Sequence, residues 1–150
     1  MKEDIFFLEE AYKEAIKAYQ KDEVPVGAVV VKDNQIIGRG HNRRIEKKNA
    51  IYHAEIVAIE DACKNTGNWR LDGCSIYITV EPCVMCAGAI MQSRIDRVVF
   101  GAIDEKGGAV ISKYNLFSDK KLPFRVSYDY IKMNKCSDIL KNFFRKKREK

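Results

Sequence analysis

The stretch SIYITVEPCVMCAGAIMQSRIDRVVFGA, residues 75–102, contains two β-rich segments separated by a segment that favours a helix. Residues 75–80 are rich in β-branched and aromatic side chains, and 97–102 hold a short apolar run typical of a buried strand. Pro82 is tolerated in the first turn of a helix, which we expect to continue to about Met91. The stretch therefore predicts a strand, a helix and a second strand.

Helical and strand patterns continue on both sides of this stretch. The elements expected before it are a helix over 5–19, a strand over 26–31, a turn at Asp33-Asn34, a strand over 35–40, a polar loop over 42–49 and a helix over 53–64. Those expected after it are a flexible loop at Gly107-Gly108, a strand over 125–131 and a helix over 135–147. A hairpin followed by alternating helices and strands predicts a three-layer α/β/α fold with a mixed sheet.

Length and composition limit the class of protein. A chain of 150 residues fits one domain, 1–150. A content of 46% hydrophobic and 32% charged residues allows the chain to form both a core and a polar surface. No run approaches the roughly 18 apolar residues of a transmembrane helix, and the N-terminus lacks the apolar region of a signal peptide. The odd number of cysteines, 5, argues against a disulfide framework. We expect a cytoplasmic protein with no membrane partner.

The charge is concentrated near the C-terminus. The net charge is +6, and residues 145–148 are all basic. Such a segment suits a polyanionic partner such as RNA. It equally suits a solvated helix end, where Lys and Arg complement the helix dipole.

Two short motifs carry the chemistry: His53-Ala54-Glu55 and Pro82-Cys83-Val84-Met85-Cys86, each at the start of an expected helix. One helical turn between Cys83 and Cys86 puts both sulfurs on the same side, where the free N–H groups favour thiolates. Neutral His53 supplies a third ligand. Three protein ligands leave a fourth tetrahedral position for water, which is the catalytic pattern of zinc. We expect one Zn²⁺ per subunit, held by these three side chains.

Glu55 distinguishes a catalytic from a structural site. It lies two positions after His53, about 200° around a regular helix, so both residues face one site only at the start of the helix. There Glu55 is expected to be the catalytic residue, moving protons between an activated water and a ring nitrogen. The combined pattern H-x-E…P-C-x-x-C is the signature of zinc-dependent nucleobase deaminases.

Two other interpretations of the cysteines are weaker. A closed structural zinc site lacks a convincing fourth ligand, because only His41 remains among the histidines and Cys63, Cys74 and Cys136 have no paired spacing. A thioredoxin-like redox pair leaves His53-Ala54-Glu55 unexplained.

Longer matches cover almost the whole chain: EVPVGAVVV from Glu23, GHNR around Asn42, HAEIVAI from His53, YITVEPCVMCAGAIMQSRIDRVVFGA from Tyr77, and ILKNFFRKKR near the C-terminus. In these segments the chain resembles the bacterial tRNA-specific adenosine deaminases, which convert the wobble adenosine of an anticodon to inosine. The resemblance implies a cytidine deaminase-like α/β/α sandwich around a mixed five-stranded sheet. It also implies a homodimer and a tRNA anticodon loop as partner.

The resemblance also implies roles for individual residues. Asn42 would hydrogen-bond the flipped base, the Ala54 N–H would contact the purine, and Val26 would form an apolar wall. Asp104 would lie near the target ribose, where a carboxylate that accepts the 2′-OH favours RNA. Each residue type also has an ordinary interpretation: a loop-capping asparagine, a core valine and a turn aspartate.

The C-terminal helix and two loops bear on the substrate. The resemblance implies that Phe144, Arg145 and Arg148 contact the anticodon loop. Residues 107–116 and 122–125 depart from the usual pattern in loops that touch the anticodon, which keeps open a deaminase of a free base or nucleoside such as guanine or cytosine. A non-catalytic RNA-binding subunit is a third possibility, and the intact Glu55 argues against it.

Overall fold

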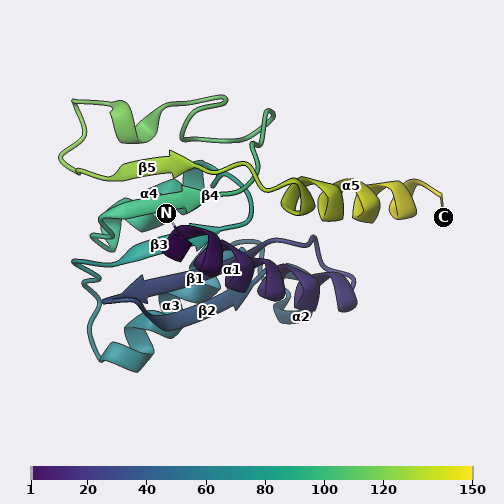
Figure 1. The fold of residues 1–150 in the computed structure, drawn as a ribbon, viewed down its shortest axis with the longest axis horizontal. Helices are drawn as coiled ribbons and strands as arrows, with labels where there is room; N and C mark the ends of the chain where they lie inside the picture. The colour runs from purple at the N-terminus through teal and green to yellow at the C-terminus, as the bar shows by residue number, and fades with distance from the viewer. Residues whose placement is uncertain (1, 150) are drawn as a thin grey trace.

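The computed structural model describes residues 2–149 and contains a five-stranded sheet with helices on both faces (Figure 1). The strands are β1 (Gly27–Lys32), β2 (Gln35–His41), β3 (Ser75–Ile78), β4 (Arg97–Phe100) and β5 (Ser127–Tyr130), and their order in the sheet is β2-β1-β3-β4-β5. The helices are α1 (Lys2–Gln20), α2 (Arg44–Lys47), α3 (Ala54–Thr66), α4 (Val84–Gln92) and α5 (Asn134–Arg148), with a 3₁₀ turn η1 at Leu116–Ser118.

The sheet is mixed, as the sequence predicts. Strand β1 pairs antiparallel with both β2 and β3, whereas β3, β4 and β5 are parallel to one another. The carboxyl ends of β3 and β4 therefore meet at one edge of the sheet, the edge on the side where α5 projects (Figure 1). Loops that follow these two strands are brought together there.

Alternation along the strands divides the core into two layers. In β1, Ala28 and Val30 pack in the cluster that contains the buried alanines of α3 and the apolar end of α4. Val29 and Val31 pack on the opposite face, with Phe7 of α1. Because successive side chains of a strand point to opposite faces, α3 with α4 and α1 cover different faces. The three-layer α/β/α prediction is confirmed.

A glycine brings α3 close to the sheet. A Cβ atom built on Gly40 of β2 would lie 2.4 Å from the backbone nitrogen of Ala58 and 2.6 Å from the carbonyl oxygen of Ala54. The absent side chain therefore lets the backbones of β2 and α3 touch directly. This contact fixes the start of α3 beside the end of β2, where Asn42 follows.

One local prediction is wrong. The segment 42–49 is not loop throughout, since it contains α2, and the buried Glu23 carboxylate accepts the backbone N–H groups of Ile45 at 3.1 Å and Glu46 at 2.7 Å. The segment at Gly107-Gly108 is a loop, as expected, and side-chain hydrogen bonds described below hold it. Helix α4 also begins slightly late, at Val84, with Cys83 as its N-cap.

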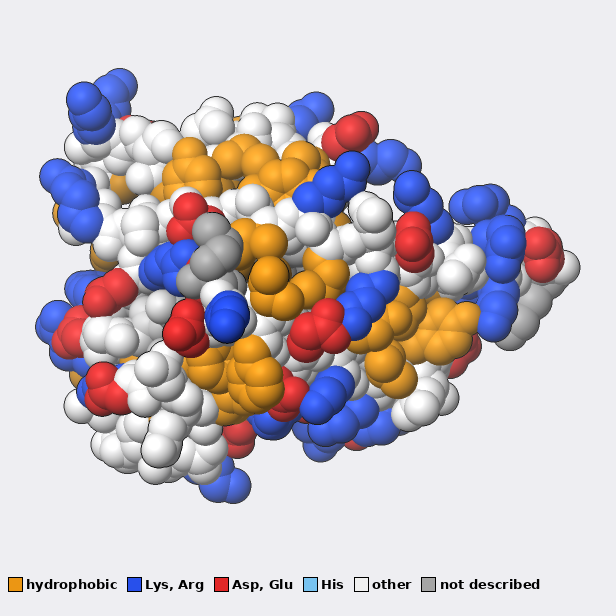
Figure 2. Space-filling model, viewed as in Figure 1, with side chains coloured by type: hydrophobic (Ala, Val, Ile, Leu, Met, Phe, Trp, Pro, Cys, Tyr) orange, Lys and Arg blue, Asp and Glu red, His pale blue; other side chains and the backbone are white. Residues whose placement is uncertain are grey.

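Helix α5 packs on α1 with one side only. Phe143 is buried and its ring lies 6.2 Å from that of Tyr19, whereas Phe144 is 44% exposed. Lys147 forms an ion pair with Asp22 at 2.5 Å. The basic end of α5 thus projects beyond the sheet, and Figure 2 shows Lys and Arg side chains gathered on this projection. Within residues 2–149, no helix combines the length and the apolar character needed to cross a membrane.

Candidate active site

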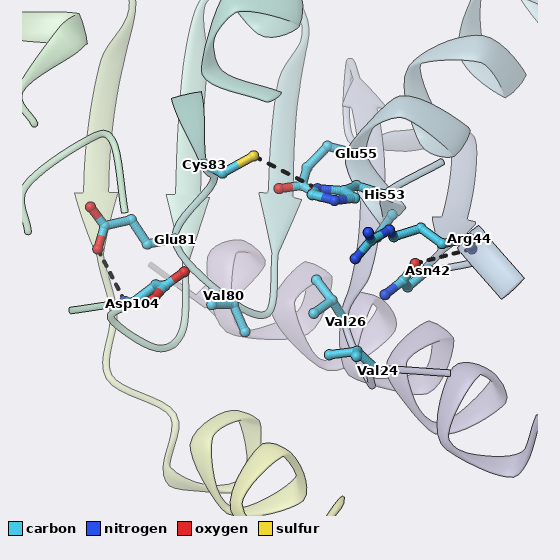
Figure 3. Close-up of a pocket in the computed structure, with 11 residues that line it drawn as sticks. Val24, Val26, Asn42, Arg44, His53, Glu55, Val80, Glu81, Cys83 and Asp104 are labelled. Atoms are coloured by element: carbon cyan, nitrogen blue, oxygen red, sulfur yellow. Dashed lines mark hydrogen bonds between the residues drawn. The ribbon is translucent and has the colours of Figure 1, made fainter. Parts of the chain in front are cut away.

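Two helix N-termini converge on one point. His53 is the N-cap of α3 and Cys83 is the N-cap of α4, and both have extended backbone angles, with φ −69° and ψ 160° for His53 and φ −77° and ψ 177° for Cys83. Neither side chain caps its own helix. Both are therefore free to point outward, toward each other (Figure 3).

The three expected ligands form a compact group. The Nδ1 atom of His53 lies 3.7 Å from Sγ of Cys83 and 3.5 Å from Sγ of Cys86, and all ligand atoms lie within 4.8 Å of one another. Tetrahedral zinc with Zn–N of about 2.1 Å and Zn–S of about 2.3 Å places N and S roughly 3.6 Å apart. The spacing of these side chains therefore fits a tetrahedral metal ion.

The two thiols differ in acidity. Cys83 accepts a hydrogen bond from the Cys86 thiol, and with further contributions from His53 and the Cys86 backbone N–H this lowers the pKa of Cys83 to about 3. The same bond, together with burial, raises the pKa of Cys86. One thiolate is thus available at neutral pH, and a metal ion that binds must displace the second proton.

Glu55 is a buried carboxyl group beside this cluster. It is 4% exposed, and burial raises its pKa to about 7. Because His53 has extended rather than helical angles, the 200° separation of a regular helix does not apply, and Glu55 lies beside His53 and Cys83 (Figure 3). A carboxyl group with a pKa near neutrality can both accept and return a proton at working pH.

The cluster forms the wall of a cavity of about 160 Å³. The residues expected to bind substrate all line this cavity: Val26, Asn42, Ala54 and Asp104. Glu55 and two of the three expected metal ligands, His53 and Cys83, line it as well, whereas Cys86 is fully buried and does not. Asn42 lies on one side of the cavity and Asp104 on the other, with Val26 between them (Figure 3). Apolar and polar groups thus face one another across a space next to the possible metal site.

Asn42 and Asp104 also have the local roles that their residue types suggest. The Oδ1 atom of Asn42 accepts the backbone N–H of Arg44 at 3.3 Å. The Oδ1 atom of Asp104 accepts the N–H groups of Lys106 and Gly107, both at 3.2 Å. These turns fix the direction in which each side chain enters the cavity.

Sequence reasoning missed Glu81, a cavity residue that is 3% exposed. Its carboxylate accepts the backbone N–H groups of Asp104, Val110, Ile111 and Ser112 at 2.8 to 3.2 Å, and the Ser112 hydroxyl at 2.5 Å. Burial alone would raise its pKa, but these hydrogen bonds outweigh burial and lower the pKa. Glu81 therefore orders the loop that carries Asp104. Its position in the sequence, between the predicted strand and Cys83, is the feature that could have identified it as a cavity residue.

Three further cavity residues were missed: Val24, Arg44 and Val80. Arg44 is placed by α2, the turn that Glu23 caps, so its position depends on a contact across 22 residues. The two valines widen the apolar wall that Val26 begins (Figure 3).

A second, larger depression continues from the cavity toward α5. It has a volume of about 660 Å³ and shares Val24, Val26, Val80 and Asp104 with the cavity. Phe144 and Arg148 line it, as do Lys106 and Lys147, whereas Arg145 does not. We call this depression the α5 groove.

Comparisons with known proteins define the class. A family model described as MafB19-like deaminase matches residues 2–148. The chain is also similar to the guanine deaminase of Bacillus subtilis, with 30% identity and a TM-score of 0.64 over 93% of this chain and 92% of that one. Fold, cavity and these matches together define a deaminase.

Closer relatives define the branch. The tRNA-specific adenosine deaminase of Streptococcus pyogenes serotype M1 is 46% identical over 151 aligned positions, covering 100% of this chain and 88% of the relative. A solved structure from studies of A-to-I editing by tRNA:A34 deaminases has 44% identity and a TM-score of 0.81, covering 84% of this chain and 97% of that one. The chain belongs to the family of tRNA-specific adenosine deaminases.

Proposed function

We propose that this chain hydrolyses the wobble adenosine of a tRNA anticodon to inosine and ammonia. The observation that carries the proposal is a cavity lined by Glu55, His53 and Cys83, next to the metal-binding group that Cys86 completes, in a chain 46% identical to a tRNA-specific adenosine deaminase. The identity to the guanine deaminase is lower, at 30%. The reaction adds water across the N1–C6 bond of the purine, and the bond between C6 and the amino group then breaks to release ammonia.

We propose zinc as the metal, one ion per subunit, held by His53, Cys83 and Cys86. The 3.5 and 3.7 Å spacings and the thiolate character of Cys83 support this assignment. When bound, zinc lowers the pKa of a water molecule toward ~7, so that hydroxide is available at neutral pH. Metal analysis of the purified protein should give one zinc per chain, and Cys83→Ala or Cys86→Ala should lose it. Full retention of zinc by either variant would contradict the ligand role.

We assign proton transfer to Glu55. Its carboxyl group takes a proton from the attacking water, gives one to the ring nitrogen and then assists the departing amine. Burial supports this role, because a desolvated carboxyl with a pKa of about 7 exchanges protons readily near neutral pH.

We assign base binding to the opposite cavity wall. The Asn42 amide and the Ala54 backbone N–H bind the polar edges of the purine, and Val26 contacts its face. The Asp104 carboxylate accepts the ribose 2′-OH, which a DNA substrate lacks. The location of all four residues on one cavity supports these roles.

We assign the α5 groove to the RNA strand that flanks the target. Phe144 is exposed there and offers a ring for base stacking, and Arg148 offers a charge for phosphate. Arg145 lies on the same basic helix end and contributes to the field around it. Neutralising Arg148 should weaken RNA binding and reduce its salt dependence by about one phosphate contact, and neutralising Arg145, which acts only through the field, should have a smaller effect. An unchanged salt slope would move the RNA contact elsewhere.

One experiment separates the RNA substrate from a free base. Purified protein is incubated with an anticodon stem-loop that carries a wobble adenosine and, in parallel, with guanine, cytosine, adenosine and cytidine. We expect inosine from the stem-loop alone. Ammonia from a free base, with no inosine in the RNA, would replace this proposal by the free-base alternative.

We also propose a homodimer and a cytoplasmic location. Val84 on α4 is 50% exposed, and a Cβ atom on Gly88 of the same helix would meet open space, so α4 offers an uncovered apolar face. All five cysteines are free, which suits a reducing compartment. Sedimentation of the wild type and of Val84→Glu tests the dimer, which the charge should weaken.

A further inference from the structure

A second group of aromatic and basic side chains lies outside the cavity and the α5 groove. The Trp69 side chain, in the segment between α3 and β3, is 61% exposed. The guanidinium carbon of Arg70 lies 5.5 Å from the centre of its ring and that of Arg94 lies 5.8 Å from it. Arg94 also lies 5.0 Å from the ring of Phe124. We call these four residues the Trp69 cluster.

The cations of the cluster are held in place by their own hydrogen bonds. Arg94 Nη1 donates to the carbonyl oxygens of Met91 at 3.2 Å and Gln92 at 3.1 Å. Arg70 Nε donates to Asp72 at 2.8 Å. Arg94 itself has a φ of 65°, in the left-handed region that a residue other than glycine seldom occupies. The arrangement around the indole is therefore set before any partner arrives.

The cluster lies at the edge of the sheet opposite the cavity. Trp69 precedes β3, Arg94 precedes β4 and Phe124 precedes β5, and these three strands are parallel. On the cavity side, Val80, Glu81 and Cys83 follow β3 at its carboxyl end and Asp104 follows β4. In Figure 1 the edge with the cluster is the one away from α5. A molecule that contacts the Trp69 cluster therefore reaches a different side of the protein from one that contacts the cavity alone.

The chemistry of the cluster fits a nucleobase next to a phosphate. An exposed indole offers a flat face for stacking, and guanidinium groups beside it can contact both an aromatic face and a phosphate. Arg70 is already paired with Asp72 at 2.8 Å, but an apolar protein surface would leave the Arg94 guanidinium without an anionic partner. The chain's net charge of +6 also favours a polyanion.

We infer that the Trp69 cluster is a second contact for the RNA substrate, in which Trp69 stacks on an unpaired base outside the loop that enters the cavity. The inference rests on the proposed tRNA substrate. It predicts that Trp69 contributes to RNA affinity but not to the chemical step, since it lies at the opposite edge from Glu55.

The chain offers a direct optical test, because Trp69 is its 1 tryptophan. The zinc-loaded protein is titrated with full-length tRNA bearing a wobble adenosine, and binding is followed independently by the anisotropy of a dye on the tRNA. Stacking on a base quenches indole emission, so we expect quenching that saturates together with the anisotropy. Unchanged emission at saturating tRNA would overturn the inference.

Substitutions separate stacking from charge. Trp69→Ala should raise KM for the tRNA by about fivefold or more and leave kcat within about twofold, as expected for loss of one stacked base. Trp69→Phe keeps a ring and should restore most of the affinity. Equal melting temperatures of the variants show that the fold is intact. Wild-type KM in Trp69→Ala, or a loss confined to kcat, would contradict a binding role.

Other ligands complete the test. Inorganic polyphosphate and poly-glutamate carry charge without bases, and neither should quench the indole as tRNA does. Equal quenching by polyphosphate would mean a general anion site, and equal quenching by poly-glutamate would mean an acidic protein partner; either result overturns base stacking. If Trp69→Ala forms inosine with an unchanged KM, only the binding role of the Trp69 cluster is refuted. If the wild type does not deaminate RNA, the proposed function itself is refuted.

Discussion

Two buried glutamates line the same cavity, and their pKa values are shifted in opposite directions. Glu55 at the start of α3 and Glu81 after β3 are 4% and 3% exposed. Burial raises the pKa of Glu55 to about 7. At Glu81 burial acts in the same direction, but the Ser112 hydroxyl and several backbone N–H groups outweigh it, so the pKa falls.

The difference comes from depth and donors together: Glu55 is the more deeply enclosed of the two, and Glu81 has many more hydrogen-bond donors. A carboxylate surrounded by N–H groups is stabilised as an anion and remains charged, so it can order a loop. A carboxyl with few donors keeps its proton until near neutral pH, so it can exchange protons with a substrate. One side of the cavity thus has a carboxyl group with a raised pKa and the other has one with a lowered pKa.

The largest effect should come from Glu55→Gln. We expect deamination to fall by about a thousandfold, because proton transfer by a positioned group contributes about 10²- to 10⁴-fold. Zinc content and melting temperature should stay close to the wild type. Glu60→Gln, on the exposed side of the same helix, is the matched control and should keep full activity. Comparable turnover in Glu55→Gln would remove this residue from the mechanism.

Glu81→Gln should act mainly on stability. The amide keeps the shape but loses the charge, so the buried N–H groups of the loop lose their common acceptor. We expect the free energy of unfolding to fall by about 2–3 kcal/mol, the scale of charged hydrogen bonds. Urea unfolding measures the change, with the exposed Glu105→Gln in the same loop as control. If both variants unfold alike, Glu81 does not order the loop.

Gly108→Ala tests the same loop without touching a charge. A Cβ atom on Gly108 would lie 2.3 Å from the carboxyl carbon of Glu81, so the loop or the carboxylate must move. Overpacking of this kind costs about 1–3 kcal/mol. Thermal unfolding should show a lower melting temperature, and KM should rise because Asp104 shifts. A variant as stable as the wild type would show that the loop adapts freely.

The smallest effect is a pH dependence of stability. A lowered pKa at Glu81 means that its stabilising contribution is present above the ordinary carboxyl pKa of 4.5 and is lost as pH falls through the lowered value. The stability difference between wild type and Glu81→Gln should therefore shrink on acidification. Urea unfolding of both proteins between pH 7 and pH 3 gives the comparison, and a constant difference would contradict it.

The sequence predicted the larger elements and the sheet type because their apolar patterns are local. The strand bounds and the start of α4 differ from expectation by at most two residues, and α1 begins three residues earlier than expected. The helix α2 was not predicted, because its four residues, three of them charged, form a turn only where the Glu23 carboxylate caps them from a distant position. The hydrogen bonds that hold the loop after Gly107 could not be predicted for the same reason, since their acceptor is Glu81, which lies far from this loop in the sequence.

The site divides in a similar way. The spacing of residues in the sequence predicted a site that contains His53, Glu55, Cys83 and Cys86. The structure places the starts of the two helices that carry these residues next to each other. The roles of Val26, Asn42, Ala54 and Asp104 came from resemblance, and the structure puts them on one cavity. Arg44 and Val80 carry no pattern of their own, because only the folding of α2 and the edge of the sheet bring them to the cavity.

The contact at Gly40 has a consequence for attempts to alter what the cavity accepts. Helix α3 rests on the backbone of β2 with no side chain between them, so the helix has no room to shift when a neighbouring residue grows or shrinks. Redesign of the pocket is therefore expected to succeed on the valine wall and in the groove beside α5, where side chains alone set the shape. In variant libraries that change residues at the start of α3, we instead expect most selected variants to be ones that restore the packing between α3 and β2.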